Sequence, residues 1–401
     1  MKKIAALGMS AVMVAGMMAG CGSNSDSSSS DSKGSSKSGD KVELTLGIWD
    51  ENQRDAMQKM IDAYEAENDN VSISIQLTPY KGGEYWTKLE ASAGGGTAPD
   101  VFWLNVLHLD SYVEGGILDD LSDAIASSDI KDNFAETLVN NYVRDGKNYA
   151  VPKDFDTNAL WYNKDLFDQA GVEYPTDDMT YDDLVALATE LKDKLPDGVY
   201  PFACPVDFQT WYYQTVYANG GWILNDDATE TGYGDAKTQE GIQCWIDMID
   251  AGLSPSASTL SETGSDAMFE GEQIAMTLAG SYMVPEYASN DTIKDKIDCV
   301  EVPTFNGVED NCINGLGFAV YEGSKQKEEA EKFAIWMGSS EAQKIQGETG
   351  VVISAREDAQ QYLQKQMSST IWQHIQTTPL KLIHCRYAAK QQNCMIWNLP
   401  G

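Results

Sequence analysis

The sequence predicts an α/β fold in which strands and helices alternate and most neighbouring strands run parallel. Two observations carry this prediction. Segments of β-rich, alternating residues and segments of helical periodicity follow one another along the first part of the body, and the same succession resumes further along the chain. At 401 residues the chain is also long enough for two domains.

The first part of the body has the pattern of a β-α-β-α-β unit. Residues 43–49 alternate and are rich in β-forming side chains, which predicts a strand. Residues 50–67 place apolar side chains three and four positions apart, which predicts a helix. A strand at 71–77, a helix at 86–93 that ends in glycines, and a buried strand at 101–104 complete the unit.

The rest of the body continues in the same style. A helix is predicted over 180–195, with Thr180 as its N-cap and Asp183 three positions later, as in a capping box. Further helices are predicted at 211–219, 237–251, 265–269, 325–337 and 340–349. Further strands are predicted at 149–152, 157–162, 274–278, 300–302 and 317–321.

The N-terminal segment, 1–20, has the three-part build of a secretory signal peptide. Its apolar run is shorter than the roughly 20 residues that a membrane span needs. It ends in Met-Ala-Gly before Cys21, which resembles a bacterial lipobox and implies cleavage before Cys21 and attachment of lipid to its thiol. A plain secretory signal with an incidental cysteine is the alternative. Residues 21–40 are almost entirely small and polar, so we predict a flexible tether.

The charge and the cysteines exclude several classes of protein. A net charge of −34 disfavours nucleic acid and anionic lipid headgroups as partners. The cysteines form neither a zinc spacing nor a disulfide framework, although Cys299 and Cys312 flank a turn-rich stretch that a local bridge could close. The acidic segment 225–230 lacks the spacing of an EF-hand loop and is interpreted as a solvated turn.

The segment 367–401 differs from the rest of the chain. It contains no Asp or Glu, in a chain where these make up 62 of 401 residues, and it has no clear periodicity. Either this anomalous tail has another role or it comes from a non-native reading frame; we favour the second interpretation.

A set of short segments, taken in order, is more specific than any of them alone. It includes GTAPDVFW at 96–103, YVEGGILDDL at 112–121, LWYNKDLFDQAGV at 160–172, FEGEQIAM at 269–276 and GLGF at 315–318. The set resembles the bacterial extracellular solute-binding proteins related to maltose-binding protein, and the resemblance covers residues 41–366.

This resemblance implies a two-lobed, periplasmic-binding-protein-like (type II) α/β fold, with a hinge and an interlobe cleft that closes on a solute. The first lobe is expected to span 41–152 and 315–354, and the second 156–302. The resemblance also implies a monomer held at the cell membrane by lipidated Cys21, which passes a sugar to the permease subunits of an ABC-type importer. It implies no catalytic residue, no cofactor and no metal.

A sugar site needs flat aromatic faces together with groups that bind hydroxyls, and α/β clefts open at the carboxyl ends of strands. These rules, together with the family's placement of a ligand-binding carboxylate, select the following candidates: Trp49, Asp50, Trp103, Asn105, Asp156, Trp211, Trp222 and Tyr282. A core position for each aromatic residue, and a turn or cap role for each polar one, remain the structural alternatives.

Two other functions stay open at this point. A secreted glycoside hydrolase needs a pair of suitably spaced carboxyl groups, and acidic residues are plentiful in this chain. However, no G-x-S-x-G motif is present, and His108 is the one histidine of the body. A binding protein for a non-sugar solute such as a polyamine would also find carboxylates beside aromatic rings here.

Overall fold

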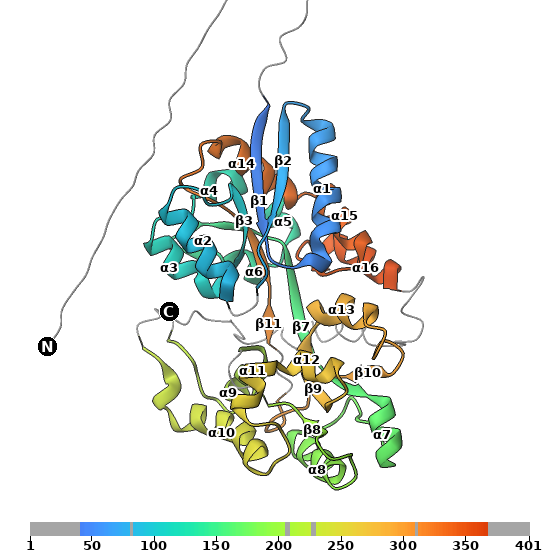
Figure 1. Ribbon diagram of the computed structural model, residues 1–401. Helices are drawn as coiled ribbons and strands as arrows, with labels where there is room; N and C mark the ends of the chain where they lie inside the picture. Colours follow the sequence, from blue (N-terminus) through green and yellow to red (C-terminus); the bar gives the residue numbers. More distant parts are fainter. Residues whose placement is uncertain (1–40, 81–82, 205–208, 226–229, 309–311, 368–401) are drawn as a thin grey trace, which may run out of the picture. The chain divides into compact units, whose positions relative to one another are not determined.

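The computed structural model describes residues 41–80, 83–204, 209–225, 230–308 and 312–367 (Figure 1). The predicted signal peptide, the tether with Cys21 and, apart from its first residue, the anomalous tail lie outside these ranges. So do the central residues, 226–229, of the acidic segment. Across the described ranges, the helices all lack the length and apolar character that a membrane crossing requires.

The first sheet has the strand order β2-β1-β3-β12-β6 (Figure 1). β1 (Val42–Ile48) pairs in parallel with β2 (Val71–Leu77) and with β3 (Val101–Asn105). β12 (Leu316–Val320) is antiparallel to both of its neighbours, β3 and β6 (Ala150–Pro152). The prediction that most neighbouring strands run parallel is wrong for β12, and it is wrong for the second sheet, where two of the three pairings along the sheet are antiparallel. The chain leaves the first sheet after β6 and returns at the same end, so the returning strand runs the opposite way.

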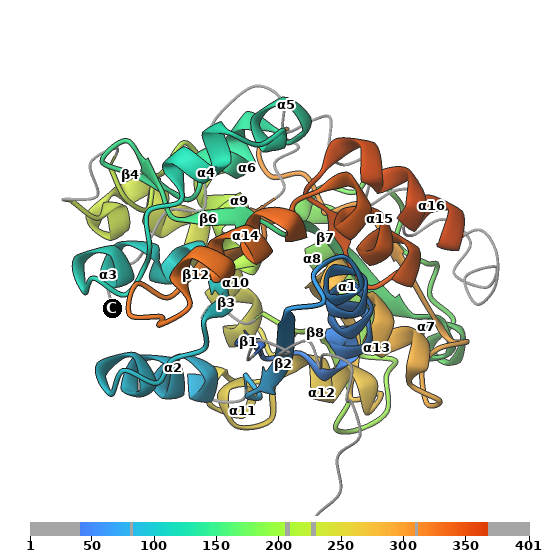
Figure 2. The same ribbon diagram turned by 90° about the horizontal axis from the view of Figure 1, so that it is seen from above.

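Helices cover both faces of the first sheet. Trp103 of β3 belongs to the core beneath α1 (Arg54–Glu67) and α14 (Lys327–Met337). Phe102 belongs to the opposite core, beneath α2 (Glu84–Gly94) and α3 (Leu109–Glu114), because successive side chains of a strand point to opposite faces. Figure 2 shows α15 (Ser340–Thr349) beside α1, with α16 (Gln360–Met367) beyond it.

The second sheet has the order β10-β7-β9-β8. β10 (Ile297–Val300) and β9 (Ile274–Gly280) flank the long β7 (Asp154–Asn163) and are antiparallel to it, whereas β8 (Tyr200–Phe202) is parallel to β9. The strand predicted at 300–302 therefore begins and ends earlier than expected, because its register is set by pairing with Leu160–Asn163.

β7 is the strand that both halves share. Its first residues pair with β11 (Ile313–Asn314) and β13 (Ile353–Ser354), and its later residues belong to the second sheet. The chain thus passes from the first sheet to the second along β7 and returns through β11, as Figure 1 shows. Residues near the start of β7 consequently face elements of both halves.

The helix predicted at 180–195 is α8 (Tyr181–Lys192), and its capping box is confirmed. The Asp183 amide donates to Thr180 Oγ1 at 3.2 Å, and the Thr180 amide donates to Asp183 Oδ2 at 2.9 Å. The remaining helices of the second half are α7 (Lys164–Ala170), α9 (Gln209–Ala218), α10 (Ala236–Asp250), α11 (Ala257–Thr263), α12 (Ser265–Glu270) and α13 (Val284–Ser289). The first half adds α4 (Ser122–Ala126), α5 (Ile130–Asn133), α6 (Glu136–Asn140), β4 (Val143–Arg144) and β5 (Lys147–Asn148).

The structure forms no disulfide among the four cysteines in the described part of the chain, which are Cys204, Cys244, Cys299 and Cys312. The local bridge that the sequence allowed between Cys299 and Cys312 is therefore not formed in this structure.

Candidate functional site

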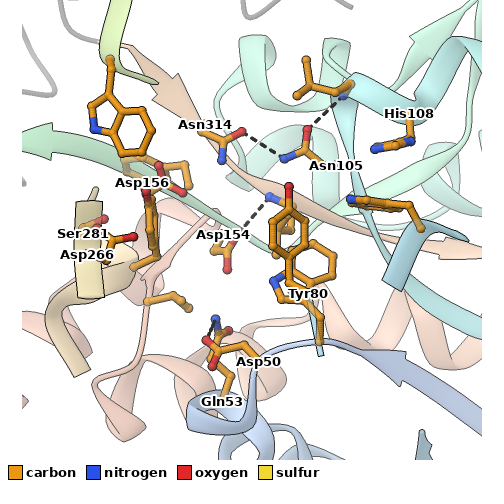
Figure 3. Close-up of a pocket in the computed structure, with 18 residues that line it drawn as sticks. Asp50, Gln53, Tyr80, Asn105, His108, Asp154, Asp156, Asp266, Ser281 and Asn314 are labelled. Atoms are coloured by element: carbon orange, nitrogen blue, oxygen red, sulfur yellow. Dashed lines mark hydrogen bonds between the residues drawn. The ribbon is translucent and has the colours of Figure 1, made fainter. Parts of the chain in front are cut away.

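A cavity of about 440 Å³ lies where the two halves meet. The first sheet supplies the residues that follow β1 and β3, and the second half supplies the end of β9 and parts of α9 and α12. The shared strand β7 and the returning β11 contribute between them. Figure 3 draws the residues that surround this cavity.

Six of the eight candidates line the cavity: Trp49, Asp50, Asn105, Asp156, Trp211 and Tyr282. They come from five separate parts of the chain, and the rule that α/β sites form at strand ends accounts for most of them. The structure does not bring Trp103 or Trp222 to the cavity, so we leave both out of the proposed site.

Trp103 is a core residue with 0% exposure. It lies in β3 on the same side as Asn105 but two positions further from the strand end, roughly 6–7 Å into the sheet. Its ring meets that of Trp49 edge-on at 5.2 Å between centroids. Trp222 instead anchors the start of α10, because its backbone exchanges hydrogen bonds of 3.0 and 2.9 Å with the Thr238 hydroxyl.

The strand-end rule could have found three residues that the sequence analysis missed. Tyr80 follows the end of β2 and is 50% exposed at the cavity. Asn314 ends β11 and faces the end of β3, where its Oδ1 accepts from Asn105 Nδ2 at 3.3 Å. Ser281 also lines the cavity and directly follows β9, next to the candidate Tyr282. Asp266, which lies in α12, gave no signal of its own in the sequence.

Aromatic rings form one wall of the cavity. The Trp49 ring lies 6.0 Å from Tyr80 and 5.4 Å from Trp86, between ring centroids. Trp86 in turn stacks on His108 at 3.8 Å, with 20° between the ring planes. Burial lowers the pKa of His108 to about 4, so the imidazole is neutral near pH 7. This wall therefore offers apolar faces without a positive charge.

A chain of polar contacts runs beneath the cavity. Gln53 Nε2 donates to Asp50 Oδ2 at 2.9 Å, and Gln53 Oε1 accepts from Lys153 Nζ at 2.6 Å. The Lys153 ammonium also pairs with the Asp154 carboxylate and lies 4.5 Å from the centre of the Trp103 ring. Asp154 Oδ1 accepts from the Leu316 amide at 3.0 Å, which ties the start of β7 to β12.

Three polar groups at the cavity are left without a hydrogen-bond partner among the described residues: Asp156 Oδ1, Asp266 Oδ1 and Ser281 Oγ. Burial, followed by repulsion from Asp154, raises the pKa of Asp156 to about 8. Burial, followed by repulsion from Glu286, raises the pKa of Asp266 to about 6. Buried polar groups without partners are costly, so these atoms mark where a ligand would supply hydrogen-bond donors.

The described residues contain no group of three His, Cys, Asp or Glu side chains placed to hold a metal ion. The lining residues offer aromatic faces together with carboxyl, amide and hydroxyl groups.

The chain belongs to the family of bacterial extracellular solute-binding proteins, whose sequence profile matches residues 50–344. This finding confirms the resemblance and the two-lobed fold expected from it. It also places the protein outside the cytoplasm, among binding proteins.

Individual relatives agree with this assignment. A binding protein of Brucella abortus is 27% identical over 304 residues, which cover 73% of this chain and 70% of that protein. The diacetylchitobiose binding protein of Streptomyces coelicolor is 26% identical over 347 residues, or 83% and 76% of the two chains. Among solved structures, an ABC substrate-binding protein of Listeria monocytogenes in complex with cycloalternan has a TM-score of 0.75 and 28% identity, with 86% and 87% of the chains covered.

Proposed function

We propose that this chain binds an oligosaccharide outside the cytoplasmic membrane and delivers it to an ABC-type importer. The observation that carries the proposal is the cavity, because its aromatic rings and its polar groups come from both halves of the fold. Rings cover the C–H faces of a sugar, while carboxyl and amide groups bind its hydroxyls. The diacetylchitobiose and cycloalternan named for two relatives are both oligosaccharides, which supports the proposal.

The size of the cavity fits a short oligosaccharide. Its volume of about 440 Å³ lies within the range of roughly 300–1,000 Å³ that is usual for small-molecule sites. A ligand that touches Trp49 from the first half and Trp211 from the second would favour the arrangement in which both residues reach it.

Calorimetric titration of the purified full chain against di- and trisaccharides tests this function. We expect one group of sugars to bind, and Trp49→Ala or Trp211→Ala to weaken that binding about tenfold or more, because each removes an aromatic face. Trp222→Ala is the matched control, since this tryptophan lies outside the cavity, and it should leave the affinity unchanged.

The same samples distinguish the competing functions. Spermidine binding without any sugar binding would replace our proposal with a polyamine-binding protein. Release of shorter sugars on long incubation would instead indicate a glycoside hydrolase, in which Asp156 and Asp266 would be the carboxyl groups to examine.

We further propose that lipidated Cys21 anchors the protein to the membrane, where it meets the permease subunits as a monomer. The lipobox-like sequence before Cys21 and the tether after it support this proposal. Cells fed a labelled fatty acid should label the wild-type protein and not Cys21→Ser. Label retained by the variant would contradict the anchor.

A further inference from the structure

The cavity has an unbalanced charge. Four carboxyl groups line it, from Asp50, Asp154, Asp156 and Asp266, and none of the described lining residues is Lys or Arg. The neutral His108 imidazole adds no positive charge. An anionic sugar would therefore find no cationic side chain among the described lining residues, which disfavours its binding.

Two of these carboxyl groups already have partners. The Asp154 carboxylate is paired with Lys153, which has 0% exposure and whose ammonium is also committed to Gln53 and to the Trp103 ring. Asp50 accepts from the Asn52 amide and from the Gln53 side chain, both at 2.9 Å. The direct contacts of the Lys153 ammonium are thus to Asp154, Gln53 and the Trp103 ring, and it acts on Asp156 only through its longer-range charge.

The carboxyl groups of Asp156 and Asp266 form no ion pair with another described residue. Asp156 is 9% exposed, its side chain has one hydrogen-bond partner, Asn314, and its Oδ1 has none among the described residues. Asp266 Oδ1 is likewise buried and without such a partner. Both residues line the same cavity (Figure 3). Two buried carboxyl groups beside aromatic faces make a site that favours a donor carrying positive charge.

We propose that the sugar bound in this cavity is an amino sugar, whose free, protonated amino group pairs with the Asp156 carboxylate while its rings lie against the aromatic wall. The inference rests on the proposed sugar-binding function and narrows it to one class of carbohydrate. An ammonium group donates charge-assisted hydrogen bonds, which are roughly twice as strong as those from a neutral hydroxyl.

Before a sugar binds, the raised pKa keeps Asp156 mostly protonated near neutral pH, so binding of an ammonium group would release that proton. The pKa of Asp156 is raised to about 8 by burial and by Asp154, while Lys153 and the bond from Asn314 act against that rise. Tyr142, which is also buried, interacts electrostatically with both Asp154 and Asp156. An incoming ammonium supplies the opposite charge that the Asp156 carboxylate lacks, so it would favour the ionised form.

Matched sugars test the proposal. The full chain is titrated with 1,4-linked di- and trisaccharides of glucose, glucosamine, N-acetylglucosamine and glucuronate, in both anomeric linkages, near neutral pH. We expect the glucosamine member to bind about tenfold more tightly than its glucose counterpart, and the glucuronate member not to bind. In Asp156→Asn the ratio of the glucosamine affinity to the glucose affinity should fall towards one. Asp266→Asn gives a second, independent variant of the same cavity.

A distant substitution controls for the general attraction of cations to an acidic protein. Asp62 is exposed on α1 and is absent from the cavity lining. Asp62→Asn changes the net charge by the same amount and should leave the preference for glucosamine intact.

The outcomes distinguish the amino-sugar inference from the proposed sugar-binding function. Binding of the glucose or N-acetylglucosamine member as tightly as the glucosamine member overturns the amino-sugar inference and leaves sugar binding in place. A preference that survives in both Asp156→Asn and Asp266→Asn overturns it as well. No binding by any member of the series counts against both proposals.

Discussion

Lys153 is a residue whose surroundings make a sharp prediction about stability. Its side chain has no exposure to solvent, and its ammonium pairs with Asp154 and donates to Gln53. Lys153→Ala would leave the Asp154 carboxylate buried without its counter-ion. We expect the variant to lose about 3–5 kcal/mol of unfolding free energy, as is usual when one member of a buried pair is removed. Urea unfolding followed by circular dichroism measures the loss.

An exposed lysine provides the control. Lys332 on α14 is 56% exposed at its side chain and pairs with Glu328 at 3.0 Å. Lys332→Ala should change stability by no more than about 1 kcal/mol, because solvent screens such a pair. Equal losses in the two variants would mean that the Lys153 pair is not buried as the structure has it.

Asp156 predicts a dependence of stability on pH. Its pKa is raised to about 8 in the folded protein, against about 3.9 in an unfolded chain. The folded state therefore keeps this proton over a range where the unfolded state has lost it, so the contribution of Asp156 to stability falls as the pH rises from about 4 to about 8. The side-chain amide of Asp156→Asn does not ionise over this pH range. Relative to the wild type, the variant should gain more than about 1 kcal/mol between about pH 5 and pH 8.

Urea unfolding of both proteins at the two pH values measures this difference in unfolding free energy. The contributions of the other titrating groups are common to both proteins and cancel when the two are subtracted. Parallel pH profiles for the two proteins would show that Asp156 is ionised in the folded state.

At the residue scale, the sequence predicted the kind of site better than its exact membership. The strand-end rule located Trp49, Asp50 and Asn105, but it also selected Trp103, because no local pattern tells how far a residue lies from the end of its strand. Asp266 could not be found at all, since its carboxyl reaches the cavity through the packing of α12 against β9. Contacts of this kind depend on tertiary structure and leave no periodic trace in the sequence.

At the element scale, local patterns predicted the helices and strands with small errors. The strand β2 has the predicted bounds, and the cap of α8 is the predicted Thr180, because alternation and capping depend on residues close together in the chain. The direction of β12 was not predictable in the same way. The direction of β12 follows from the way the chain returns to the first sheet through β11, which pairs with β7. This pairing joins residues more than a hundred positions apart in the sequence.

The packing of α10 against α9 makes a prediction about a glycine. A Cβ added at Gly241 would lie 2.7 Å from the Thr215 carbonyl oxygen and 2.7 Å from Val216 Cα. The backbone would have to move, so Gly241→Ala should lower the unfolding free energy by about 1–3 kcal/mol. This is the reverse of the usual effect of replacing a helical glycine with alanine.

Gly94, in the last turn of α2, is the matched control. A Cβ there meets nothing within 4 Å, so Gly94→Ala should leave stability unchanged or raise it by up to about 1 kcal/mol. Thermal unfolding of the two variants compares them. A destabilised Gly94→Ala together with an unaffected Gly241→Ala would contradict the close approach of the two helices.

At the scale of the whole molecule, the site exists because β7 belongs to both halves. Its first residues, Asp154 to Asp156, lie against β11 and β13, and its later residues build the second sheet. The alternation of strands and helices predicted an α/β fold, but it could not predict that one strand would be shared. The resemblance to the family implied two lobes and a hinge, but a shared strand depends on how the chain crosses between the sheets and was not predicted.

A ligand that contacts both halves should protect both from hydrogen exchange. With sugar at about a hundred times its dissociation constant, the folded state gains about 2.7 kcal/mol. We expect slower exchange in the segment around Trp49 to Gln53, after β1, and in the segment around Ser281 and Tyr282, after β9, since both line the cavity. Hydrogen exchange read by mass spectrometry distinguishes the two segments. Protection in one of them alone would mean that the sugar binds to one half and does not bridge the cavity.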